Sequence, residues 1–118
     1  KTGSLFVAAT MGGALAAGHD PKPWRGLGDT LGEAYQVADD LLDACAEEAG
    51  KPTGQDAQLG RPNAVAEHGI EGAVDKLREL VDQAAESVPH CGGAPPLRAL
   101  VRQMAERLVP ASLRQTAA

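Results

Sequence analysis

Acidic side chains gather in the stretch Tyr35–Asp43 at a spacing that could hold a metal ion. Asp39, Asp40 and Asp43 lie within four residues of one another. At about 100° per residue on a helix, they share with Gln36 one stripe roughly 100° wide. Carboxylates this close repel one another unless water or a cation screens their charge. Because Mg²⁺ accepts one or two carboxylates beside phosphate oxygens of a substrate, the spacing indicates a candidate magnesium site.

The same pattern has an ordinary structural explanation. A helix on a protein surface carries a polar stripe beside an apolar face, and Asp29, Glu33 and Glu47 lie near the same side. The rest of the circumference is apolar and comprises Ala34, Tyr35, Val37, Ala38, Leu41, Leu42 and Cys45. Periodicity alone leaves both interpretations open, and a solvated acidic face is the commoner of the two.

Helices would position these acids, because helical periodicity extends over most of the chain. Apolar residues recur at steps of three and four, whereas no stretch alternates as a strand would. Gly and Pro residues separate the periodic stretches at Gly18–Pro21, Gly50–Pro62 and Pro89–Pro96. Four helices are predicted, over roughly residues 2–17, 24–49, 63–88 (with a break at Gly69) and 97–109. The predicted fold class is therefore all-α.

The first predicted helix is apolar almost all round, with Leu5, Phe6 and Leu15 spread over its circumference. Such a helix needs burial on all sides and favours a core position in a larger domain. The chain also enters this helix without an initiator methionine or a start cap. We therefore expect a segment that begins in mid-domain, with residues 1–110 as the last helices of a larger domain and residues 111–118 as a tail.

Composition excludes several classes of function. Eleven basic residues against sixteen acidic ones give a net charge of −5, and no Lys/Arg cluster offsets it, so a nucleic-acid partner is not expected. Apolar runs are too short for a transmembrane segment, and no secretory signal is present. Cys45 and Cys91 stand alone, which is typical of reduced thiols in a cytoplasmic protein.

Other motifs are weak. The glycines of Gly26–Gly32 only approximate a dinucleotide-binding fingerprint, and no strand precedes them. Gly50–Thr53 lacks the upstream glycine of a phosphate-binding P-loop. His19, His68 and His90 are too scattered for a zinc site and are expected on the surface.

Three short motifs, in contrast, occur in a meaningful order. Lys1-Thr2 opens the chain, the pattern Tyr-Gln-x-x-Asp-Asp-x-x-Asp covers residues 35–43, and Gly-Lys-x-x-Gly-x-Asp covers residues 50–56. Together they resemble the second aspartate-rich region of the trans-type polyprenyl diphosphate synthases, with the Lys-Thr motif one helix upstream. The segment GRPNAVAEHGIEGA is most similar to bacterial geranylgeranyl diphosphate synthases of pigment (carotenoid) pathways. The resemblance extends over nearly the whole chain.

The resemblance implies the fold and the reaction. The fold would be the class I isoprenoid-synthase helical bundle, of which this chain supplies the C-terminal part, in a homodimer. The reaction would be head-to-tail condensation of isopentenyl diphosphate with an allylic diphosphate, with Mg²⁺ as cofactor. Geranylgeranyl diphosphate is the expected product, and farnesyl diphosphate is the alternative.

The resemblance also implies residue roles. Asp39, supported by Asp40 and Asp43, would hold Mg²⁺ bridging to the allylic diphosphate. The remaining site residues would contact that diphosphate (Lys1 and Lys51) or line the site near the reacting carbons (Thr2 and Gln36). Arg61 stands where the family often has a second diphosphate-binding lysine; it keeps the charge and changes the geometry.

The first aspartate-rich motif of the family is absent from this sequence, as are the basic residues that hold isopentenyl diphosphate. The isolated chain is therefore expected to be inactive. Two alternatives remain: a non-catalytic helical subunit that associates with a complete synthase, and a terpene cyclase of the same fold. Cyclases usually carry an Asn/Ser/Glu metal motif, so the second aspartate-rich motif favours chain elongation.

Overall fold

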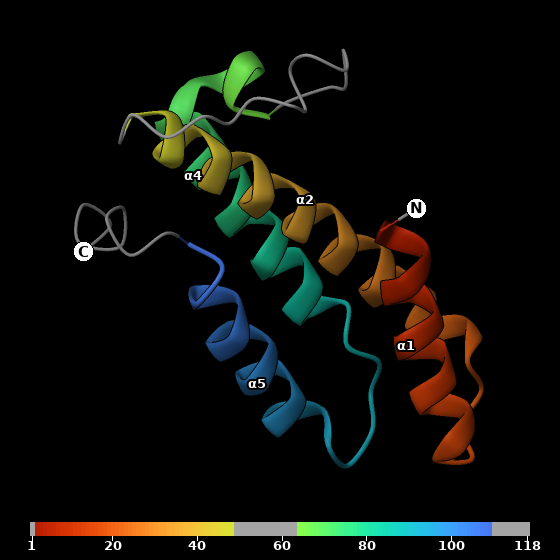
Figure 1. Cartoon of the computed structure of the whole chain (residues 1–118). Helices are drawn as coiled ribbons and strands as arrows, with labels where there is room; N and C mark the ends of the chain where they lie inside the picture. The colour runs from red at the N-terminus through yellow and green to blue at the C-terminus, as the bar shows by residue number, and fades with distance from the viewer. Residues whose placement is uncertain (1, 49–63, 110–118) are drawn as a thin grey trace.

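The computed structural model describes residues 2–48 and 64–109, and in these residues all regular structure is helical (Figure 1). A short 3-10 turn, η1, precedes the second helix. The elements are α1 (Thr2–Ala16), η1 (Lys22–Trp24), α2 (Arg25–Glu48), α4 (Ala64–Glu86) and α5 (Ala94–Glu106). The predicted all-α fold class is confirmed.

Two glycines end or break helices where the sequence predicts it. Gly18 has φ of 81°, and its N–H donates to the carbonyl of Leu15 at 3.0 Å. The next N–H, of His19, donates to the carbonyl of Ala14 at 2.8 Å. This pair of bonds satisfies the last carbonyls of α1 in a Schellman motif. Gly69, with φ of 73° and ψ of 172°, interrupts α4, as expected from its position in the sequence.

The start of α5 differs from the prediction. The sequence predicts a loop through Pro96, whereas α5 begins at Ala94 and takes Pro95 and Pro96 into its first turn. The N–H groups of a first turn have no partner within the helix, and the φ of proline suits a helix, so prolines are tolerated there.

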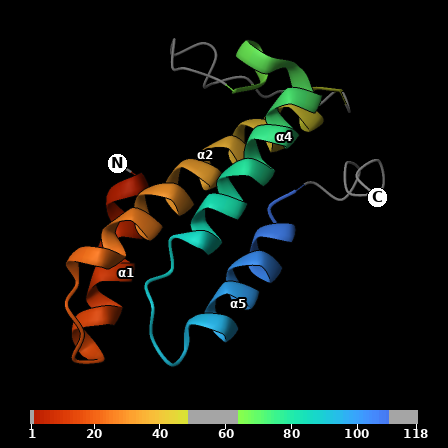
Figure 2. The ribbon, with the colours of Figure 1, turned by 180° about the vertical axis from the view of Figure 1, so that it is seen from behind.

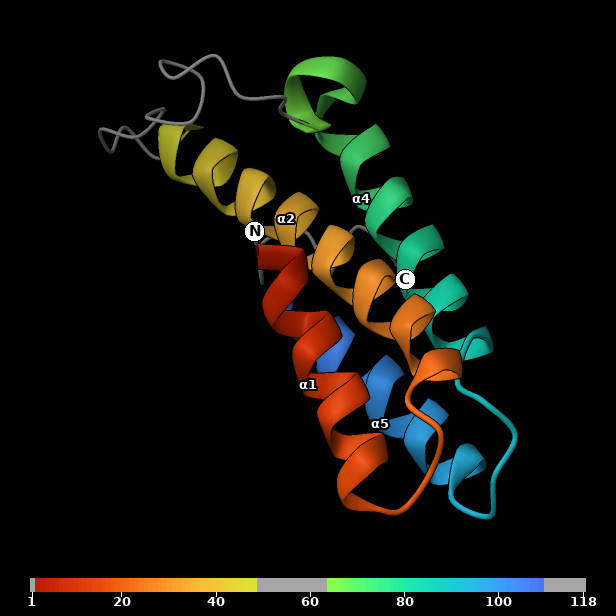
Figure 3. The same ribbon diagram turned by 90° about the vertical axis from the view of Figure 1, so that its right-hand side faces the viewer.

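The helices pack in the order α1, α2, α4, α5. Figures 1 and 3 show α2 between α1 and α4, and Figure 2 shows α5 alongside α4. A core cluster joins α2 to α4 and consists of Ala34, Val37, Ala38, Leu41, Ala73, Leu77, Leu80 and Val109. A second cluster includes the start of α2, the end of α4 and α5, and consists of Leu27, Ala84, Ala85, Val88, Ala94 and Val101. Helix α2, which carries the acids, thus packs against α4 on one side and against α1 on the other.

Helix α1 is not buried on all sides within the described residues. It packs against α2 and buries Ala14. On its outer side Leu5 is 74% exposed and Leu15 is 61% exposed. The expectation that this helix needs further neighbours agrees with the exposed apolar surface, which is costly to leave in water.

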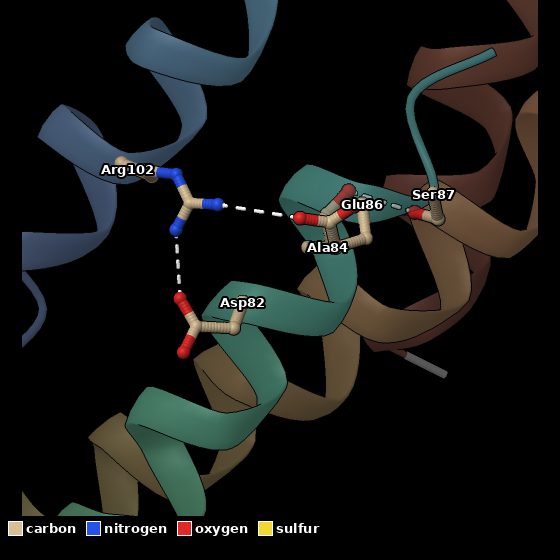
Figure 4. A network of polar contacts seen from close by, with 5 residues as sticks. All are labelled: Asp82, Ala84, Glu86, Ser87 and Arg102. Carbon is tan, nitrogen blue, oxygen red and sulfur yellow. Dashed lines mark hydrogen bonds and ion pairs between the residues drawn. The ribbon is translucent and has the colours of Figure 1, made fainter.

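An ion-pair cluster joins α5 to α4 (Figure 4). Arg102 Nη1 donates to Asp82 Oδ1 at 2.7 Å, and Nη2 lies 3.7 Å from Glu86 Oε1. Next to it, the hydroxyl of Ser87 donates to the carbonyl of Ala84 at 2.8 Å. All three charged side chains are largely exposed to solvent.

Because water screens exposed ion pairs, Arg102→Ala is expected to lower the free energy of unfolding by less than about 1 kcal/mol. Thermal unfolding at low and high salt measures this. The small loss should shrink at high salt. The control is Arg78→Ala, which truncates an exposed arginine of α4. A loss that is large and independent of salt would contradict this account.

Candidate functional site

Helix α2 presents the acids of the candidate site from its C-terminal half. Gln36, Asp39 and Asp43 are partly exposed, so each can reach both solvent and the packed surface of the bundle. Asp39 and Asp43 are four residues apart on the helix, which makes them neighbours on its surface. The two carboxylates can therefore face one ligand together.

Asp40 differs from its two neighbours because it is only 3% exposed. It lies beside Leu41 and one turn from Val37, both in the core cluster between α2 and α4. The acidic stripe lies across the boundary between the open and the packed side of α2, with its edge at Asp40 on the packed side. A buried carboxylate needs compensating interactions, and Asp40 does take part in a hydrogen bond, ion pair or electrostatic interaction within the chain. Its role as a metal ligand remains a prediction.

The donor set fits a hard divalent cation. Asp39 and Asp43 offer carboxylate oxygens, and Mg²⁺ is bound in proteins by one or two carboxylates with substrate phosphates and water completing its shell. No cluster of three or more His, Cys, Asp or Glu residues able to hold a metal occurs in the described part of the chain.

Helix α1 brings its N-terminal end to the middle of α2 (Figure 3). A Cβ built on Gly32 would lie 2.7 Å from the Cα of Gly3, so the two backbones touch. The rings of Phe6 and Tyr35 pack nearby, with centroids 5.6 Å apart. Thr2, the first residue of α1, is thereby placed on the helix end that faces the middle of α2.

Gly28 makes a similar contact, since a Cβ built on it would lie 2.6 Å from the Cα of Val7. This role of Gly28 and Gly32 was not predicted from the sequence, where the two glycines form only part of a weak dinucleotide-binding motif. Their spacing of four residues on a helix is the signal that could have identified them, because small residues at this spacing allow two helices to approach closely.

The other predicted site residues lie beyond what the structure describes. Lys1, Lys51 and Arg61 are outside the described ranges, as are the Gly-Lys loop and the tail from residue 111. Thr2 begins α1, but its side chain is not described. The diphosphate-binding roles of Lys1, Lys51 and Arg61 remain predictions, as does the place of Thr2 near the reacting carbons.

The structure also places the residues that were considered for other chemistry. His19, His68 and His90 are exposed, as expected. Cys45 and Cys91 are not joined in a disulfide, and both are partly buried. In the ranges 2–48 and 64–109, none of the helices combines the length and apolar character needed to cross a membrane.

Comparisons with known proteins identify relatives over most of the chain. A family model described as polyprenyl synthetase matches residues 1–93. A geranylgeranyl diphosphate synthase of Cereibacter sphaeroides is 52% identical over 96% of this chain and 40% of its own length. A geranylgeranyl diphosphate synthase of Rhodobacter capsulatus is 48% identical over 95% of this chain and 40% of its own length.

A farnesyl diphosphate synthase of Escherichia coli is 42% identical over 75% of this chain and 31% of its own length. No solved structure matches the chain. The chain thus spans about 40% of the length of the two relatives from Cereibacter and Rhodobacter.

Proposed function

This chain belongs to the polyprenyl synthetase family, and on that basis we propose that it forms the C-terminal part of a polyprenyl diphosphate synthase. The synthase joins isopentenyl diphosphate head to tail to an allylic diphosphate, with geranylgeranyl diphosphate as product. The observation that carries this proposal is the pair Asp39 and Asp43, which stays partly exposed on a helix otherwise packed on two sides. The identity to two geranylgeranyl diphosphate synthases supports the choice of product.

Asp39 and Asp43 would bind Mg²⁺, with Asp40 in support from the buried side of α2. When bound, the ion supplies positive charge that neutralises the departing diphosphate. Asp39 would fix the ion where the diphosphate end of the allylic substrate binds, because a carboxylate and a diphosphate repel each other without a cation between them. Gln36, one turn earlier, lines the site toward the reacting carbons. The lysines Lys1 and Lys51, and Arg61, add positive charge to the same diphosphate.

The condensation needs no reactant besides the two diphosphates. The allylic C–O bond breaks, and its electron pair leaves with the diphosphate. The double bond of isopentenyl diphosphate attacks the allylic carbon and forms the new C–C bond. A proton is then lost to the released pyrophosphate, which restores the double bond. Helices that exclude water protect the allylic cation from quenching.

The exposed side of α1 would pack against the rest of the synthase. Residues 2–16 carry no charged side chain, and Leu5 and Leu15 leave large apolar surfaces on that side. Burying them stabilises the contact by about 25 cal/mol per Å² of apolar surface removed from water. We propose that the first aspartate-rich motif and the isopentenyl diphosphate site lie in that remaining part, in a cytoplasmic homodimer.

The experiment that tests this function is an assay of the complete protein that contains this chain. With an allylic diphosphate and isopentenyl diphosphate it should release pyrophosphate and form a longer prenyl diphosphate. Chelation with EDTA should abolish the activity, and added Mg²⁺ should restore it. Residues 1–118 alone should form no product.

Each outcome has a clear consequence. A complete protein that is inactive alone, but alters the turnover of a separate prenyl synthase, would favour the non-catalytic subunit. Prenyl elongation by residues 1–118 alone would contradict the proposal that the other half of the site lies elsewhere. Release of a cyclic hydrocarbon in place of a longer diphosphate would favour a cyclase.

A further inference from the structure

We propose that Gly28 and Gly32 are positioning residues, which set the distance between the N-terminal end of α1 and the acids of α2. The inference rests on the proposed function, because it concerns the geometry of that site. Gly28 and Gly32 would touch neither substrate nor metal, and they would act on the site through the backbone of α1.

The contact between the two helices is a contact of backbones. A Cβ on Gly32 would lie 2.7 Å from the Cα of Gly3, and a Cβ on Gly28 would lie 2.6 Å from the Cα of Val7. The two contacts are four residues apart on both helices, with opposite direction along the chain. The antiparallel helices therefore meet at two successive turns, and each contact requires a glycine on α2.

A third contact fixes how α1 is placed along α2. The hydroxyl of Thr10 donates to the carbonyl of Trp24 at 2.9 Å, and it lies 3.2 Å from the carbonyl of Val7. A Cβ on Gly28 would lie 2.7 Å from this hydroxyl oxygen. The hydroxyl thus occupies the space that the missing side chain of Gly28 leaves open. Together, the three contacts resist both the sliding of α1 along α2 and the separation of the two helices.

This packing places the two halves of the candidate site relative to each other. Thr2 is the neighbour of Gly3 on α1, and Asp39 follows Gly32 by seven residues on α2, about 10 Å along the helix axis. A side chain on residue 32 would place its Cβ 2.7 Å from the Cα of Gly3, whereas an ordinary contact is at least 3.4 Å. The two backbones would therefore have to separate by roughly 0.7 Å. A displacement near 1 Å in a positioned catalytic group can cost about 100-fold in rate.

The test compares Gly32→Ala with Gly26→Ala in the complete synthase. Gly26 lies on the same helix, and a Cβ built there meets nothing within 4 Å, so this variant adds the same methyl group without overlap. We expect Gly32→Ala to lower kcat/KM for the allylic diphosphate about 100-fold. The KM for isopentenyl diphosphate should stay within about twofold, because that substrate binds elsewhere. Gly26→Ala should keep wild-type kinetics.

A binding measurement gives a readout that does not depend on turnover. Titration calorimetry of inorganic pyrophosphate in the presence of Mg²⁺ should show about tenfold weaker binding by Gly32→Ala and unchanged binding by Gly26→Ala. Circular dichroism establishes the folded fraction of each variant. If activity falls only in proportion to that fraction, with both KM values and pyrophosphate binding unchanged, the role is merely structural and the inference is overturned.

Failure of the inference and failure of the proposed function can be told apart. A wild-type protein without synthase activity contradicts the function, whereas an active wild type with an equally active Gly32→Ala contradicts only the positioning role. If Gly32→Ala does not fold, Thr10→Val takes its place, since it replaces the hydroxyl with a methyl group of similar size and removes the hydrogen bond to the carbonyl of Trp24. A several-fold loss of kcat/KM for the allylic diphosphate is then expected, and wild-type kinetics would overturn the inference.

Discussion

Replacing Asp39 with alanine is expected to lower the turnover of the complete synthase about 10²–10³-fold while leaving its helix content unchanged. The proposed function gives this carboxylate the task of holding the cation that faces the departing diphosphate. Its side chain is only partly buried, so truncation opens no large cavity in the core. Alanine is also the best helix former, so α2 should persist.

The matched control is Asp29→Ala on the same helix. Asp29 is exposed, and its Oδ2 lies 3.8 Å from Arg25 Nε in a surface pair that contributes little to stability. Turnover of this variant should remain near the wild-type value. A titration with Mg²⁺ should show that Asp39→Ala needs a higher concentration for half-maximal activity. Unchanged turnover of Asp39→Ala would contradict the metal assignment.

Local signals in the sequence were enough to predict the helices. The steps of three and four in apolar residues give the approximate position and length of the helices in residues 2–48 and 64–109. Gly18 and Gly69 mark an end and a break because both take positive φ, which is strained for other residues. These features depend on a few neighbouring residues, and such features can be derived without knowing the rest of the fold.

The candidate site was only partly predictable for a physical reason. Periodicity places Asp39, Asp40 and Asp43 on one stripe, but burial depends on which helices pack against α2 and at what angle. Asp40 is buried, and its neighbours Val37 and Leu41 pack in the core cluster between α2 and α4. The same limit applies to Gly28 and Gly32, whose contacts with α1 exist only in three dimensions. Their spacing of four residues indicates that a helix can approach closely there, but it does not say which helix does so or at which turn.

Leu77→Ala is expected to lower the free energy of unfolding of the complete synthase by about 2–5 kcal/mol. Leu77 is 0% exposed and belongs to the core cluster that joins α4 to α2. Its truncation removes apolar contacts on both helices and leaves a cavity, because tightly packed helices relax only in part. Thermal unfolding should show a midpoint lower by roughly 5–15 °C.

The control for this prediction is Leu77→Met, which conserves volume and should cost less than about 1.5 kcal/mol. Comparing Leu77→Ala with Leu77→Met isolates the effect of core packing, because neither variant adds or removes a charge near the acids of α2. If the core between α2 and α4 holds the acidic helix in place, Leu77→Ala should lose activity at a lower temperature than Leu77→Met. The two should have similar turnover well below both midpoints. An equal midpoint for Leu77→Ala and wild type would show that this core does not hold α2 in the assembled synthase.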